Sequence, residues 1–107
     1  LVTYVLHADS LEIISLDSIQ EGKGIGSRLM AEVEQFAMEH AIPKIELITT
    51  NDNLQALKFY QKRGYRITHI FQNAVMEARK VKPTIPLIGN DGIPLLDELK
   101  LQKKIVD

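Results

Sequence analysis

The chain has 107 residues, of which 45% are hydrophobic and 25% charged, a composition typical of one globular domain with a single core. Its 13 basic and 14 acidic side chains give a net charge of -1, so no basic excess indicates binding to nucleic acid or to an anionic membrane. The absence of cysteine excludes disulfides, thiolate metal sites and a cysteine nucleophile. No apolar run approaches the roughly 20 residues of a membrane span. We therefore expect a single cytoplasmic domain over residues 1–107.

The first half of the chain predicts a hairpin followed by a helix. Residues 1–7 and 11–16 are apolar and β-branched, and the short polar link between them favours an antiparallel pair of strands. Residues 17–26 contain three glycines and break the pattern. From Gly24 the spacing becomes helical, and the segment ends before Pro43. The predicted inner face consists of Ile25, Leu29, Met30, Val33, Phe36 and Ala37, and the predicted outer face of Glu32, Glu34, Gln35 and Glu39.

The second half alternates strands and helices. A strand is expected over 44–50, a helix over 54–63 after the capping signal Asn51–Asn53, and a strand over 65–71 after Gly64. A short helix over 73–81 and a loop over 84–94 follow. Residues 95–105 suit either a strand or a helix, and we favour the strand. Alternation of this kind indicates an α/β fold with a sheet of mixed direction.

The glycine-rich segment 21–26 joins a predicted strand to a predicted helix. Glycines there allow a sharp turn and a close approach of the backbone to a ligand. Consecutive main-chain N–H groups and the positive end of the helix favour a phosphate or pyrophosphate. A turn without any ligand is the alternative. The P-loop string G-x-x-x-x-G-K-[ST] does not occur, and the dinucleotide fingerprint G-x-G-x-x-G is not matched because the third glycine comes one residue early.

Two motifs resemble those of the GNAT superfamily of N-acetyltransferases. Gly24 and Gly26 fill the glycine positions of its Gln/Arg-x-x-Gly-x-Gly/Ala signature, in which Glu21 departs from the first position. The second motif, Asn-x-x-Ala-x-x-x-Tyr-x-x-x-Gly-[Phe/Tyr], is matched throughout, by Asn53, Ala56, Tyr60, Gly64 and Tyr65. The resemblance covers about residues 10–71. It implies an α/β (α+β) fold with a mostly antiparallel mixed sheet flanked by helices, and a chain that lacks the family's first strand and first two helices.

The resemblance also implies roles for particular residues. Acetyl-CoA would be the co-substrate, with no metal, and Tyr60 would protonate the departing thiolate while Glu12 serves as general base. The alternatives are that Tyr60 only packs in the core and that Glu12 is a solvated carboxylate. The cofactor-binding residues it implies are Leu16, Asp17, Ser18, Gly22, Lys23, Gly24, Ile25, Gly26, Ser27, Asn53, Ala56 and Tyr60.

Three functions stay open on this basis. The first is acetyl transfer from acetyl-CoA to a primary amine of a small molecule or peptide, by direct attack and without nucleic acid or membrane partners. The second is a non-catalytic module that binds CoA, and the third an assembly domain with an empty loop, for which a homodimer is one arrangement. His7, His40 and His69 show no ligand spacing, and we interpret them as ordinary surface or core residues. The basic run Arg79, Lys80 and Lys82 is interpreted as a solvated face.

Overall fold

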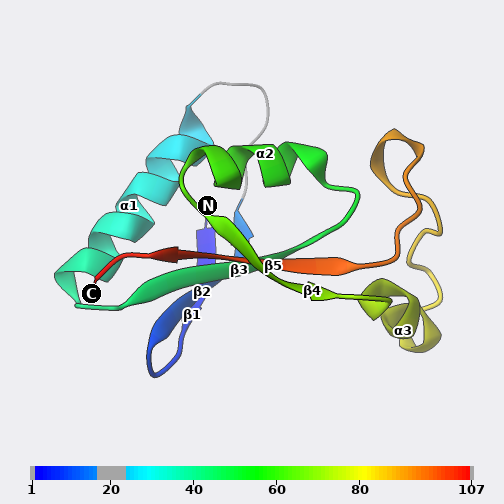
Figure 1. Cartoon of the computed structure of the whole chain (residues 1–107), viewed down its shortest axis with the longest axis horizontal. Helices are drawn as coiled ribbons and strands as arrows, with labels where there is room; N and C mark the ends of the chain where they lie inside the picture. The colour runs from blue at the N-terminus through cyan, green and yellow to red at the C-terminus, as the bar shows by residue number, and fades with distance from the viewer. Residues whose placement is uncertain (1, 17–23, 107) are drawn as a thin grey trace. The chain divides into compact units, whose positions relative to one another are not determined.

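The computed structural model of the chain describes residues 2–16 and 24–106. Figure 1 shows strands alternating with helices along this part of the chain. None of the described helices combines the length and apolar character that crossing a lipid bilayer requires. In chain order the elements are β1 (Val2–Leu6), β2 (Ser10–Leu16), α1 (Ile25–Glu39), β3 (Lys44–Thr50), α2 (Leu54–Lys62), β4 (Arg66–Phe71), α3 (Ala74–Val81), the 3₁₀ turn η1 (Asn90–Gly92) and β5 (Glu98–Lys104).

The strands form one mixed sheet in the order β1-β2-β3-β5-β4. β1 and β2 are antiparallel and are joined by a tight turn, in which His7 N donates to Ser10 O at 2.9 Å. β2 and β3 are parallel, with a register that runs from Ser10↔Lys44 to Ile13↔Leu47. Parallel neighbours need a long crossover, which α1 supplies here. The predicted hairpin and the mixed direction of the sheet are therefore confirmed.

The chain packs as two compact units, each with its own buried side chains. One unit comprises Leu1–Leu47 and Gln102–Asp107, and the other comprises Ile48–Leu101. Fully burying a large aliphatic side chain contributes about 1.5–3 kcal/mol to stability, so both clusters matter for folding. The first cluster consists of Leu11, Ile13, Met30, Val33, Ala37, Ile45 and Leu47, and the second of Ala56, Tyr60, Tyr65, Val75 and Leu101.

Most predicted elements are confirmed to within two residues. α1 begins one residue after Gly24, β3 covers the predicted range, and Gly64 adopts φ 96° directly after Arg63, the C-cap of α2. Residues 98–104 form the strand β5, so the helical alternative for the last segment is wrong.

Two charged residues that we predicted to face solvent are instead engaged. Glu34 in α1 has only 15% of its side chain exposed and forms an ion pair with Lys103 of β5, at 3.4 Å. Arg79 in α3 is half-buried and donates hydrogen bonds to the main-chain carbonyls of Ile85, Pro86 and Leu95. The predictions failed because the sequence around each residue does not reveal a distant partner. On the predicted inner face, Ile25 is 44% exposed because it lies at the first helical position.

The turn between β3 and α2 fixes the segment that precedes β5. The Asn51 side chain accepts hydrogen bonds from Leu96 N and Asp97 N, both at 3.0 Å. Asp52 is 6% exposed and accepts from the Thr50 hydroxyl at 2.5 Å and from Asn90 N at 2.8 Å. Burial acts to raise the pKa of Asp52, but these hydrogen bonds outweigh it, and the pKa is lowered. Asn51 and Asp52 thus hold the loop in place besides preceding a helix.

Candidate functional site

The first turn of α1 presents main-chain N–H groups directly after the glycine-rich segment. Gly24 is the N-cap residue, with φ 77° in the left-handed region, and no side chain caps the helix. The first turn of any helix leaves N–H groups without intrahelical acceptors. In α1 the N–H of Arg28, which comes after this turn, donates to Gly24 O at 3.0 Å. No acidic side chain lies in this turn to neutralise the positive end of the helix dipole. The amides of residues 25–27 therefore suit an anionic ligand.

Position 24 requires glycine because of its backbone dihedral angle, and not because neighbouring atoms would exclude a side chain. A Cβ atom at Gly24 would meet no other atom within 4 Å, but φ 77° is strained for any L side chain. Among the described residues, the space on the side where a Cβ would project is therefore open. Of the other predicted cofactor residues in this region, Leu16 ends β2 opposite Val2, and Asp17, Ser18, Gly22 and Lys23 lie outside the described residues.

Asn53 and Ala56 form the start of α2, as the capping signal predicted. The Asn53 side-chain oxygen accepts a hydrogen bond from Ala56 N at 3.2 Å, so Asn53 is confirmed as the N-cap. Ala56 is 2% exposed and lies on the inner face of the helix. The structure assigns both residues a part in folding, and their predicted contact with a cofactor stays a prediction.

Tyr60 lies one turn further along α2 and is 5% exposed. Its ring makes edge contacts with the rings of Phe59 and Tyr65, with centroids 5.2 and 5.6 Å away. Burial raises the pKa of Tyr60 to about 12, so its phenol keeps its proton at neutral pH. Tyr60 therefore packs in the core. It also keeps the proton that it would need to protonate a departing thiolate.

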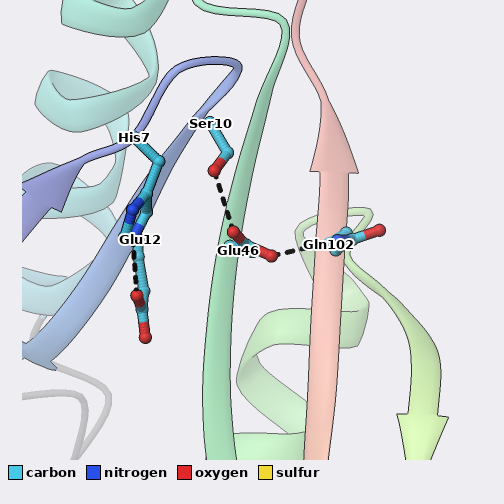
Figure 2. A network of polar contacts seen from close by, with 5 residues as sticks. All are labelled: His7, Ser10, Glu12, Glu46 and Gln102. Carbon is cyan, nitrogen blue, oxygen red and sulfur yellow. Dashed lines mark hydrogen bonds and ion pairs between the residues drawn. The ribbon is translucent and has the colours of Figure 1, made fainter.

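Glu12 lies on β2 and makes a close contact that the sequence did not reveal. Figure 2 shows the contact of His7 with Glu12, in which His7 Nε2 lies 2.8 Å from Glu12 Oε1. The His7 side chain is 46% exposed and that of Glu12 is 29% exposed. Glu12 stands opposite Val5 in the hairpin, and His7 is two residues beyond Val5, so both side chains project from the same face of the sheet. The interpretation of His7 as an ordinary histidine missed this pairing, which the tight turn between the strands makes possible.

A second glutamate lies opposite Glu12 in the register of the neighbouring strand. Glu46 is the register partner of Glu12 in the parallel pairing of β2 with β3. Its Oε1 accepts from the Ser10 hydroxyl at 2.8 Å, and its Oε2 accepts from Gln102 Nε2 at 3.1 Å (Figure 2). Both oxygens of Glu46 are therefore engaged, whereas the contact with His7 involves one oxygen of Glu12.

The predicted site residues are divided between the two units. Glu12, Leu16 and residues 24–27 belong to the first unit, and Asn53, Ala56 and Tyr60 belong to the second. Within the described ranges, no three histidine, aspartate or glutamate side chains gather in a way that could hold a metal ion.

Comparison with known proteins gives a family match over more than half of the chain. The model of the Acetyltransferase (GNAT) family matches residues 7–65, a range that includes Glu12, Gly24 and Tyr60. The uncharacterized protein YxbD of Bacillus subtilis (strain 168) is 54% identical over 105 residues, which are 98% of this chain. The chain spans 66% of the length of that relative.

Solved structures resemble the fold closely. The IAA acetyltransferase of Bacillus cereus ATCC 14579 is 25% identical with a TM-score of 0.76, over 96% of this chain and 69% of its own. A GNAT family acetyltransferase of Elizabethkingia anophelis, solved with acetyl-CoA bound, is 26% identical with a TM-score of 0.76. That match covers 96% of this chain and 67% of the other.

Proposed function

We propose that this chain, which belongs to the GNAT acetyltransferase family, serves to transfer the acetyl group of acetyl-CoA to a primary amine. The observation that carries the proposal is the uncapped start of α1, where a left-handed glycine precedes a turn of amides that contains no acidic side chain. A related structure that is 26% identical has acetyl-CoA bound, which supports the choice of co-substrate.

The cofactor would be held chiefly by main-chain groups. The amides of residues 24–27, with Gly22 and Lys23 before them, would bind the pyrophosphate. The end of β2 at Leu16, with Asp17 and Ser18, would pair with the pantetheine arm in the manner of an added strand. For Asn53 and Ala56, the assignment to cofactor binding rests on the family's second motif alone. Main-chain binding of this kind tolerates Glu21 in place of the family's Gln or Arg.

Acetyl transfer by direct attack needs one group to take a proton and one to give a proton. Acetyl-CoA supplies a thioester whose carbonyl carbon accepts the amine nitrogen while the sulfur leaves. Glu12, partly exposed on β2, would take the proton of the amine directly or through water. Tyr60, protonated at neutral pH, would give its proton to the sulfur and regain one from solvent. A main-chain N–H near Leu16 would stabilise the oxyanion.

The proposal is tested by measuring acetyl-CoA consumption against a panel of primary amines, together with calorimetric titration of CoA. Turnover on at least one amine, with saturable CoA binding, is the expected result. Tight binding without turnover on any amine would instead indicate a module that only binds CoA. An absence of both heat and thermal shift with CoA would overturn the cofactor assignment itself.

A further inference from the structure

We propose that His7 is a positioning residue, which orients the Glu12 carboxylate so that one defined oxygen receives the proton of the acceptor amine. The inference rests on the function proposed above and adds to it a residue outside the family's motifs. It begins from a contact that the hairpin builds across its own turn, between His7 Nε2 and Glu12 Oε1 at 2.8 Å.

The hairpin fixes where the imidazole lies. His7 N donates to Ser10 O at 2.9 Å, and this hydrogen bond closes the turn. Further along the hairpin, Val5 is paired with Glu12. The His7 side chain is therefore diagonal to Glu12 on one face, a spacing that long side chains can bridge. An imidazole with its proton on Nε2 donates to the carboxylate, which has no proton to give when ionised.

The contact leaves the other oxygen of Glu12 for chemistry. Among the described residues, Oε1 is the Glu12 oxygen that has a partner, and Oε2 has none. A glutamate on a strand surface samples several rotamers, and a hydrogen bond at one oxygen restricts where the second oxygen lies. A general base must reach its proton at hydrogen-bond distance, so fixing Oε2 raises the share of productive geometries.

Glu46, on the neighbouring strand, has the pattern of hydrogen bonds expected of a glutamate with a structural role. Glu46 accepts from Ser10 at one oxygen and from Gln102 at the other, which links three strands (Figure 2). Glu12, its register partner, is held at one oxygen by a side chain that is itself 46% exposed. The two residues are register partners on neighbouring strands, and the pattern of their hydrogen bonds assigns the base to Glu12 and the structural role to Glu46.

The experiment compares steady-state kinetics of the full-length protein with those of three variants. His7→Leu removes the donor, His7→Gln keeps a side-chain N–H donor, and Gln102→Leu removes a partner of Glu46 as the control. We expect His7→Leu to lower kcat about tenfold, a fraction of what a general base supplies, with the KM for acetyl-CoA changed less than about twofold. His7→Gln recovers most of the lost kcat. Gln102→Leu lowers the Tm and leaves kcat near the wild-type value.

A second measurement does not depend on turnover. The ¹⁵N shifts of the His7 ring in the wild type should show a proton on Nε2. A ring protonated on Nδ1 alone would overturn the inference, because Nε2 could not donate.

The kinetic outcomes separate the two proposals. If the wild type turns over an amine and His7→Leu matches it in kcat, the positioning role is wrong and the acetyltransferase function stands. If the wild type turns over no amine, the proposed function fails and the role of His7 fails with it.

Discussion

Tyr60 is buried against two aromatic rings, and its proposed role depends on the single hydroxyl at the end of its own ring. Replacing it by phenylalanine removes the proton donor and keeps the ring that packs against Phe59 and Tyr65. We expect Tyr60→Phe to lower kcat by about 10²-fold or more, the usual contribution of a general acid. The KM for acetyl-CoA should change little, because the lost interaction forms in the transition state. Steady-state kinetics with a saturating amine measures both.

Tyr65→Phe is the matched control for that substitution. Tyr65 is 2% exposed and its ring lies 5.6 Å from that of Tyr60, so the change removes a hydroxyl from the same buried cluster. Its kcat should stay within about threefold of the wild type if only the Tyr60 proton enters the chemistry. Equal losses in both variants would mean that the hydroxyls act through packing.

Gly89 faces Asp52 so closely that no larger residue fits. A Cβ atom at position 89 would overlap the Asp52 carboxylate and lie 2.9 Å from its Cβ atom. Gly89→Ala must therefore displace Asp52 from its bond with Asn90 N, and we expect a loss of about 1–3 kcal/mol in the free energy of unfolding. Urea denaturation measures the loss. Gly92→Asn is the control, because its Cβ meets no atom within 4 Å and asparagine tolerates the left-handed φ of 75°.

At the scale of the element, the start of α1 depends on a left-handed residue. Gly24→Ala forces a β-carbon into that conformation at a cost of about 1–2 kcal/mol, or turns the amides away from the ligand. If residues 25–27 bind the pyrophosphate, the Kd for CoA should rise about tenfold, as calorimetry would show. Gly24→Asn should weaken binding less, because asparagine adopts φ above zero more readily. Unchanged affinity in Gly24→Ala would place the pyrophosphate elsewhere.

Elements whose limits depend on nearby residues could be predicted from the sequence. The Asn53 side chain caps an amide three residues away, and Gly64 ends α2 within its own turn, so both limits of this helix are encoded locally. The two glycines at the start of α1 identified the candidate anion site for the same reason, since a helix start and its free amides are properties of one short segment.

Contacts between distant segments could not be predicted in this way. Glu34 meets Lys103, 69 residues along the chain, and Asn51 meets the amides of Leu96 and Asp97. No spacing rule links such pairs before the fold is known. His7 and Glu12 are only five residues apart, but their contact depends on the exact register of the hairpin, which one residue of slip would abolish.

At the scale of the whole molecule, the charge is nearly balanced, with 13 basic and 14 acidic side chains. A net charge of -1 creates no long-range field that would draw an anionic cofactor toward the protein. Binding of CoA would therefore depend on local donors, above all the amides at the start of α1, and on Lys23, which precedes them in the sequence.

Global stability should fall at alkaline pH because of Tyr60. Its pKa is about 12 in the folded chain against an ordinary value of 10.0, so the folded state holds this proton more tightly. Its contribution is complete below pH 10 and is lost as pH rises from 10 to 12, where the unfolded chain has ionised and the folded chain has not. The loss is on the order of 2 kcal/mol, and it is absent in Tyr60→Phe.

Urea unfolding of both proteins at pH 8, 10.5 and 11.5 isolates this contribution, because every other group titrates alike in the two chains. The difference in unfolding free energy between wild type and Tyr60→Phe should shift in favour of the variant as pH rises. A difference that stays constant across this range would mean that the phenol reaches solvent in the folded protein. In that case the folded chain would hold the phenol proton no more tightly than the unfolded chain does.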